Sequence, residues 1–209
     1  MAMIEMIHGD FADVDLPLGG FQLILTDPPY KRELALPCYE VLARRSHALL
    51  GEHGSLVTIV PHHLLSKTIQ VMAASPLRYR WIYNMDQEDG PHPRMAMGIE
   101  VCWKPILHYV KGTFPARKGF IRDKVPIPNP EKDLHEWQQA ESWAKYFIEK
   151  FTQPGDTILD PFVGTGTVAT VALKLDRNVV GIDTDTAMLE KTWQRLSPIP
   201  SAWAPLPTT

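Results

Sequence analysis

The sequence predicts an α/β fold, in which one mostly parallel β-sheet is covered by helices. Short apolar runs alternate along the chain with segments of helical periodicity, which is the pattern of such folds. One of these runs leads into a glycine-rich turn that opens a helix, as in a βα unit that binds a ligand. The 209 residues, of which 44% are hydrophobic and 22% charged, fit one soluble globular domain with a substantial core.

Seven runs are predicted to be strands and five segments to be helices. In the first helix, Tyr39, Leu42 and Ala43 recur at helical spacing and mark its buried face. Segments 86–98 and 112–133 are polar or rich in proline and glycine, and are predicted to be loops. The predicted strands are residues 3–8, 21–26, 55–60, 78–85, 99–110, 157–161 and 178–183, and the predicted helices are residues 39–50, 63–74, 138–151, 166–175 and 187–196.

Several classes of protein and site are excluded by composition. No apolar run approaches the roughly 20 residues of a membrane helix, and the N-terminus lacks the basic and apolar regions of a signal peptide. Neither Cys38 nor Cys102 belongs to a Cys-x-x-Cys pair, and the pair His62-His63 has no acid or cysteine at ligand spacing. These features predict a cytoplasmic protein with reduced core thiols, no disulfide and no metal site.

The charge distribution is uneven. A formal charge of −3 is unusual for a nucleic-acid-binding domain. However, residues 104–124 carry six basic side chains and a single acid, Asp123, and a local basic face can contact phosphates. An ordinary solvated surface explains the same run equally well. The basic residues are Lys104, Lys111, Arg117, Lys118, Arg122 and Lys124, with Arg78, Arg80 and Arg94 upstream.

The glycine-rich turn has the features of a site for a nucleoside-bearing cofactor. Glycines allow the backbone to turn tightly and a ligand to approach it, and free N–H groups at a helix start attract an anion. Asp183 ends the next predicted strand, 19 residues after Gly164, where a carboxylate can accept hydrogen bonds from ribose hydroxyls. The turn comprises Asp160, Pro161, Phe162, Val163, Gly164, Thr165, Gly166 and Thr167.

Two other interpretations of this turn stay open. The spacing Gly164-x-Gly166-x-x-Ala169 also fits the fingerprint of a nicotinamide dinucleotide site, as in an oxidoreductase. Such a domain needs several strands after the second one, whereas here a proline-rich tail follows soon after, so the rest of the sheet must come from the N-terminal half. The turn could also bind nothing, but the strand, turn, helix and acid all agree with a ligand site.

A second motif, Asp27-Pro28-Pro29-Tyr30, ends the predicted strand 21–26. The two prolines fix φ and stiffen the turn. Because they have no backbone N–H groups to donate, carbonyls in the turn stay free to accept from a ligand. Asp27 and the Pro28 carbonyl can each accept one N–H of an amino group, which aims the nitrogen lone pair at a methyl donor. Asp27 can then take the proton, and Tyr30 can stack on a base that has left the duplex. A rigid turn with an ordinary surface aspartate is the alternative.

Together the two motifs resemble those of the amino-group DNA methyltransferases, which methylate N6 of adenine or N4 of cytosine. The target-base motif, Asp27 to Tyr30, precedes the cofactor motif, Asp160 to Thr167. This permuted order resembles the β class of the family, and in particular the short stand-alone forms of bacteriophages and prophages. The resemblance extends over residues 7–185.

The resemblance implies a Rossmann-like S-adenosylmethionine-dependent methyltransferase fold with a seven-stranded, mostly parallel sheet. Residues 1–209 would form a single methyltransferase domain, with small target-recognition insertions around residues 86–98 and 112–133. It also implies double-stranded DNA as substrate, and from the basic residues named above we expect Arg94, Lys111, Arg117, Lys118, Arg122 and Lys124 to bind it. The implied catalytic residues are Asp27, Pro28, Pro29 and Tyr30, and the implied S-adenosylmethionine-binding residues are Asp10, His135, Trp137, Asp160, Pro161, Phe162, Gly164, Thr165, Gly166, Thr167 and Asp183.

Adenine is the expected target, because cytosine members of the family more often carry serine where Asp27 stands. N4-cytosine transfer is the nearest alternative, and a non-catalytic DNA-binding protein that kept the fold is another. The family allows a homodimer. A chain of this length has no room for a nuclease domain beside the fold, so a partner restriction endonuclease would be a separate protein in the bacterial or phage-infected cytoplasm.

Overall fold

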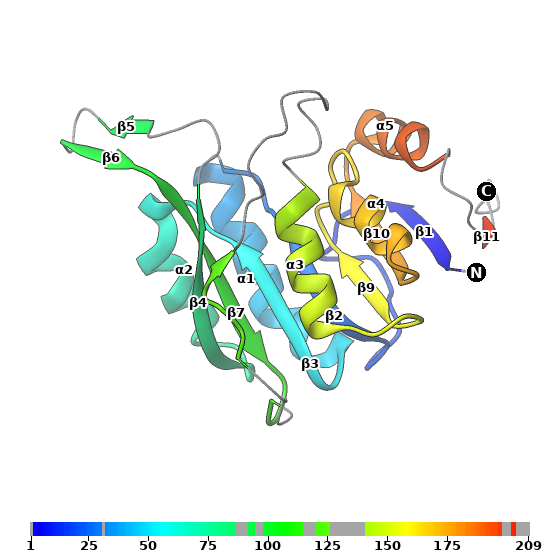
Figure 1. Cartoon of the computed structure of the whole chain (residues 1–209), viewed down its shortest axis with the longest axis horizontal. Helices are drawn as coiled ribbons and strands as arrows, with labels where there is room; N and C mark the ends of the chain where they lie inside the picture. Colours follow the sequence, from blue (N-terminus) through cyan, green and yellow to red (C-terminus); the bar gives the residue numbers. More distant parts are fainter. Residues whose placement is uncertain are drawn as a thin grey trace.

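The computed structural model describes residues 2–30, 32–86, 92–94, 98–114, 120–125, 141–197 and 202–203. Within these residues the chain forms a nine-stranded sheet with helices on both faces (Figure 1), which confirms the predicted α/β class. None of the helices in the described ranges has the length and apolarity that crossing a bilayer requires.

Strands and helices alternate along most of the chain. The strands of the main sheet are β1 (Met3–His8), β2 (Phe21–Thr26), β3 (Leu50–Ile59), β4 (Arg78–Asp86), β7 (Trp103–Val110), β8 (Lys124–Val125), β9 (Thr157–Asp160), β10 (Asn178–Asp183) and β11 (Ala202–Trp203). The helices are α1 (Arg32–Leu49), α2 (Leu65–Met72), α3 (Ser142–Phe151), α4 (Thr167–Lys174) and α5 (Thr186–Leu196), with a 3-10 turn, η1 (His62–Leu64), before α2.

The sheet order is β11-β1-β10-β9-β2-β3-β7-β4-β8. Among these strands β7 alone runs against its neighbours, β3 and β4. The switch point of the sheet lies between β9 and β2. From β9 the chain continues to β10 on one side, and from β2 it continues to β3 on the other side. In open α/β sheets, ligands bind beyond the carboxyl ends of the strands at such a switch point. Here Asp27 directly follows β2 and Asp160 ends β9, so both predicted motifs lie at this point.

Two apolar layers hold the helices on the sheet. One face packs against α3, α4 and α5, with Phe147 and Ile148 fully buried. The other face packs against α1 and α2. The predicted inner face of α1 is confirmed, because Tyr39, Leu42 and Ala43 are all buried there.

The seven predicted strands all exist, but the predicted strand 99–110 is wrong in one respect. It breaks at Cys102 into β6 (Ile99–Val101) and β7. Instead of joining the main sheet, β6 pairs with β5 (His92–Arg94), which lies inside the predicted loop 86–98. This two-stranded ribbon projects beyond the main sheet (Figure 1). The sheet also exceeds the expected seven strands by the two-residue edge strands β8 and β11.

Two further expectations need correction. The predicted strand 55–60 begins earlier, at Leu50, because residues 51–54 form an irregularity where the partner of Phe21 is Leu50 and that of Leu23 is Ser55. Glycines and charges in this stretch hide it from a search for apolar runs. The expected core thiols are also wrong for Cys102, which is exposed at the break between β6 and β7.

Candidate functional site

The glycine-rich turn adopts the predicted strand–turn–helix geometry. β9 ends at Asp160 and α4 begins at Thr167. Gly164 and Gly166 have φ angles of 51° and 77°, in the left-handed region that favours glycine. A Cβ on Gly166 would also lie 2.7 Å from Cγ2 of Thr192 on α5. Glycine at position 166 therefore meets both a backbone and a packing requirement.

Asp183 lies directly beside this turn, as expected. It ends β10, the neighbour of β9, and its Oδ2 accepts a hydrogen bond from the Gly164 amide at 2.9 Å. Its other oxygen accepts from the Asp185 amide at 2.9 Å. Each carboxylate oxygen has a second lone pair, so these bonds fix the carboxylate and leave it able to accept from a ligand hydroxyl.

Asp10 joins the same edge from β1. The Gly9 amide donates to the Asp183 carbonyl at 3.0 Å, which places the residues after β1 next to the end of β10. The Asp10 side chain accepts from the Ala12 amide at 2.8 Å. The neighbouring Phe11 ring packs edge-on against Phe162 of the glycine-rich turn, with ring centroids 6.0 Å apart. The residues after β1 therefore lie beside both the end of β10 and the glycine-rich turn.

The two sequence motifs touch each other through Asp160. Its buried Oδ1 accepts a hydrogen bond of 2.7 Å from the hydroxyl of Thr26, the residue before Asp27. It also accepts from the Phe162 amide at 3.3 Å. Since β2 and β9 are paired strands, a contact across 134 positions of sequence joins the candidate catalytic turn to the candidate cofactor turn.

The carboxylates of Asp27, Asp160 and Asp183 make the region between the two motifs negatively charged. Burial raises the pKa of Asp160 to about 7, although the bonds from Thr26 and Phe162 oppose the rise. The negative charges of Asp27 and Asp183 raise that pKa further. A cluster of carboxylates around a partly protonated acid favours a ligand with a positive charge.

The Asp-Pro-Pro-Tyr turn presents a carboxylate and an aromatic ring. The Tyr30 hydroxyl donates to Asp27 Oδ2 at 2.9 Å, and Tyr30 as a residue remains 41% exposed. Pro28 is buried and Pro29 exposed. Asp27 can be reached by solvent, but the surrounding protein removes enough water to raise its pKa to about 6. The Tyr30 bond and the charge of Lys104 oppose this rise.

Lys104, which the sequence offered only as one member of a basic run, lies beside Tyr30. Its ammonium lies 5.4 Å from the centre of the Tyr30 ring. It stands near the start of β7, and the antiparallel pairing of β7 brings that start to the edge where the other strands end. A lysine within a basic run carries no signal of this position. Only the direction of β7 within the sheet reveals it.

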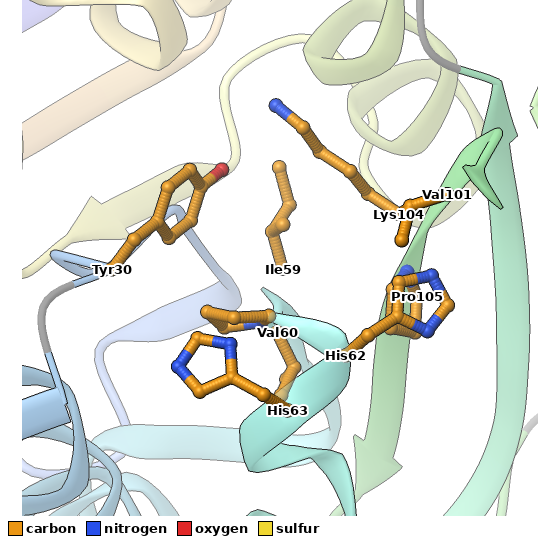
Figure 2. A pocket seen from close by; sticks show the side chains of 9 residues that line it. Tyr30, Ile59, Val60, His62, His63, Val101, Lys104 and Pro105 are labelled. Carbon is orange, nitrogen blue, oxygen red and sulfur yellow. The ribbon is translucent and has the colours of Figure 1, made fainter. Parts of the chain in front are cut away.

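A pocket opens beside Tyr30, with a volume of about 90 Å³. In Figure 2, Tyr30 and Lys104 stand on opposite sides of it, with Ile59 between them. Segment 61–63, which follows β3, forms another wall. A second hollow of about 440 Å³ shares His62, His63 and Val101 with the first and continues under β6. A concave, partly apolar surface therefore leads from Tyr30 toward β6 of the two-stranded ribbon.

Of the predicted DNA-binding residues whose side chains the structure describes, Lys111 and Lys124 lie at opposite ends of the strands. Lys111 lies at the opposite edge of the sheet, where its ammonium donates to the Leu50 carbonyl at 2.7 Å, so its assignment to the site is corrected. Lys124 lies near the end of β4, but it is paired with Asp86 at 2.8 Å. Arg122 is exposed. The backbone of Arg94 lies in β5, whereas Arg117, Lys118, His135 and Trp137 fall outside the described residues.

Comparisons with known proteins agree with the motifs. Residues 97–193 match a family model described as DNA methylase. The type II methyltransferase M2.DpnII of Streptococcus pneumoniae is 42% identical over 53% of this chain and 48% of its own length. The type II methyltransferase M.HinfI of Haemophilus influenzae is 38% identical over 32% of this chain and 19% of its own. The chain thus spans less than half the length of these curated relatives.

Solved structures share the fold. A complex of M1.HpyAVI with S-adenosylmethionine has a TM-score of 0.71 at 21% identity, covering 93% of this chain and 100% of that one. The cytosine-N4-specific PvuII DNA methyltransferase has a TM-score of 0.76 at 14% identity, covering 93% and 86%. The α/β architecture is that of these methyltransferases. The chain is therefore similar in sequence to DNA methylases over residues 97–193, and it shares the fold of solved DNA methyltransferases.

Proposed function

We propose that this protein methylates the exocyclic amine of a base in double-stranded DNA, with N6 of adenine as the favoured target and S-adenosylmethionine as methyl donor. The observation that carries the proposal is the bond from Thr26 to Asp160. It holds a turn suited to an amino group against a turn suited to a nucleoside cofactor, at the switch point of the sheet. Two reactants held at this junction could meet in line.

The residues present fit S-adenosylmethionine better than a nicotinamide dinucleotide. Asp27, Asp160 and Asp183 concentrate negative charge at the turn. A sulfonium cation is attracted there, whereas the two negative charges of a pyrophosphate would be repelled. Asp183 would accept from the ribose hydroxyls, and Asp10 and Phe162 would flank the adenine. His135 and Trp137 stay predicted cofactor residues.

The chemistry follows from the groups around Asp27. The cofactor would supply an electrophilic methyl group, whose bond to sulfur breaks as the N–C bond forms and leaves S-adenosylhomocysteine. Asp27 and the Pro28 carbonyl would each accept one N–H of the target amine, which withdraws the nitrogen lone pair from the ring and directs it at that methyl. Once the N–C bond forms, the nitrogen is acidic and Asp27 takes its proton. Tyr30 would stack on the extruded base, in the pocket that Lys104 closes from the other side.

We infer that DNA approaches along the edge that carries the β5–β6 ribbon. A two-stranded ribbon fits the major groove, and the hollow beneath β6 is continuous with the pocket at Tyr30. Arg94, Arg117, Lys118 and Arg122 stay candidates for phosphate contacts. Lys111 is left out because it lies at the far edge, and Lys124 because its charge is already paired.

The test is to express the chain in a bacterial host that lacks DNA methylases and to sequence its genomic DNA by a single-molecule method that detects modified bases. N6-methyladenine at a defined motif, absent from an Asp27→Ala control, would support the proposal. N4-methylcytosine would keep the mechanism and change the base. Unmodified DNA from a well-expressed protein that binds S-adenosylhomocysteine would contradict a DNA substrate.

The pH profile of the reaction should report Asp27. Because Asp27 must be ionised to accept an N–H and a proton, kcat/KM is expected to fall below about pH 6, which is the pKa of this carboxyl. Lys104→Met should move this acid limb upward by roughly half a pH unit or more, because the lysine charge stabilises the ionised form. Initial rates between pH 5 and 8.5 measure both effects.

Lys124→Met is the matched control for that experiment. It removes an ammonium from the same edge of the sheet, but one bonded to Asp86. Its acid limb should coincide with that of the wild type. An acid limb that Lys104→Met and Lys124→Met move equally would show that Lys104 has no specific effect on Asp27.

A further inference from the structure

Helix α5 contacts the glycine-rich turn through the side chains of Thr192 and Arg195. α5 packs against α4 and β10 (Figure 1). The Thr192 hydroxyl donates to the Gly164 carbonyl at 2.8 Å. One guanidinium nitrogen of Arg195, Nη1, lies 3.2 Å from the Thr165 carbonyl and 3.2 Å from the Thr167 hydroxyl. Thr192 and Arg195 are three positions apart and so share one face of α5.

These contacts fix how the turn presents its backbone. A trans peptide unit is planar, and its N–H points opposite to its C=O. When Thr192 draws the Gly164 carbonyl toward α5, the amide of Thr165 is directed away from α5. On the other side, Asp183 accepts from the Gly164 amide. The orientation of the peptide groups is thus set jointly by α5 and β10, before any ligand arrives.

Arg195 also ties the turn to the start of α3. Its second nitrogen, Nη2, donates to Glu141 Oε1 at 2.8 Å, and the two side chains are only 20% and 18% exposed. Lys174 donates to the other oxygen of the same carboxylate at 2.7 Å, but it is 50% exposed and lies at the far end of α4 from the turn. A guanidinium holds its N–H donors in one rigid plane, so it can bond several acceptors in a fixed arrangement. The N–H groups of an ammonium rotate and fix no such arrangement.

We propose that Arg195 is a positioning residue that presets the glycine-rich turn for the cofactor, through Thr165, Thr167 and Glu141. This inference rests on the proposed function, since it takes the turn to bind S-adenosylmethionine.

Three variants test the role: Arg195→Met, Arg195→Lys and Lys174→Met. Arg195→Met should weaken S-adenosylhomocysteine binding about tenfold by calorimetry and raise the KM for S-adenosylmethionine by a similar factor, with kcat at saturating cofactor within about twofold of wild type. Arg195→Lys should recover part of the affinity. Lys174→Met removes a cation from the same carboxylate without touching the turn, and should bind like the wild type.

Each outcome has one meaning. If the wild type binds no S-adenosylhomocysteine, the proposed function fails before Arg195 is tested. If the wild type binds but Arg195→Met and Lys174→Met give equal affinities, Arg195 has only a structural role and the inference is overturned. Thermal unfolding of all three variants identifies any loss of affinity that comes from misfolding. Thr192→Val, which keeps the side-chain shape and removes the bond to Gly164, should weaken cofactor binding in the same direction as Arg195→Met.

Discussion

Asp27→Asn is expected to slow methyl transfer by about 1000-fold or more, the loss typical when both a charge-based contact and a proton acceptor are removed. Asparagine keeps the size of the side chain and one acceptor oxygen. It has no negative charge to polarise the amine, and it cannot take the proton that leaves the nitrogen after the N–C bond forms. Single-turnover rates on DNA, with radiolabelled S-adenosylmethionine, measure the effect.

Cofactor affinity separates this role from a general loss of structure. Asp27 lies beyond the end of β2, and the ribose and turn contacts are assigned to other residues, so S-adenosylhomocysteine should bind Asp27→Asn within about threefold of wild type. Tyr30→Phe removes the bond to Asp27 but leaves the ring. It should retain far more activity than Asp27→Asn, because stacking needs only the ring. Comparable activity in Asp27→Asn and the wild type would exclude Asp27 as the catalytic acceptor.

The local parts of the site could be predicted because each motif is continuous in sequence. Gly164 and Gly166 stand where a strand gives way to a helix, and the structure confirms left-handed backbone at both. Asp183 could be found from its distance to the first glycine alone. These features all belong to one βαβ unit, in which the positions of the glycines and of the acid along the sequence determine where they lie in the structure.

Contacts between distant elements could not be predicted in the same way. The bond from Thr26 to Asp160 depends on β2 and β9 being neighbours, and nothing in either strand specifies its partner. The parallel strands on both sides of the switch point are equally apolar, so the sequence predicts the sheet without its order. The roles of Glu141 and Arg195 are hidden for the same reason, since ion-pair partners 54 positions apart carry no local pattern.

Charge runs were the least informative signal. Lys104 and Lys111 belong to one basic run, yet they stand at the two ends of β7. Seven residues of extended chain span roughly 23 Å, at about 3.3 Å for each residue. Lys104 therefore lies at the pocket beside Tyr30, while Lys111 donates a hydrogen bond to the Leu50 carbonyl at the other end of the strands. Like charges spread along a strand lie at different ends of that strand, so together they do not form one binding surface.

The second large effect concerns stability, and it follows from the buried carboxyl of Asp160. Burial raises its pKa from the ordinary value of 3.8 to about 7. The folded state therefore binds this proton more tightly than the unfolded chain does, so the contribution of this carboxyl to stability is greatest below about pH 4 and declines as the pH rises to 7. Asp160→Asn cannot ionise, and its Oδ1 can still accept from Thr26 and Phe162. It should be more stable than wild type at pH 8.

The expected gain is on the order of 4 kcal/mol at pH 8, from about 1.4 kcal/mol for each pKa unit, and it should shrink as the pH falls toward 4. Urea denaturation at pH 8 and pH 5 measures it. Thr26→Val, which removes the hydroxyl donor, should destabilise the wild type at pH 8 more than it destabilises Asp160→Asn. Equal stability of Asp160→Asn and wild type at both pH values would contradict a buried charge.

A cationic ligand offsets the negative charge of Asp160. The wild type should therefore bind S-adenosylmethionine, which carries a sulfonium, more tightly than S-adenosylhomocysteine, whose sulfur is uncharged, and Asp160→Asn should show a smaller difference between the two affinities. The protein would then lose affinity at the position where it gains stability, as expected of a carboxylate retained for its ligand.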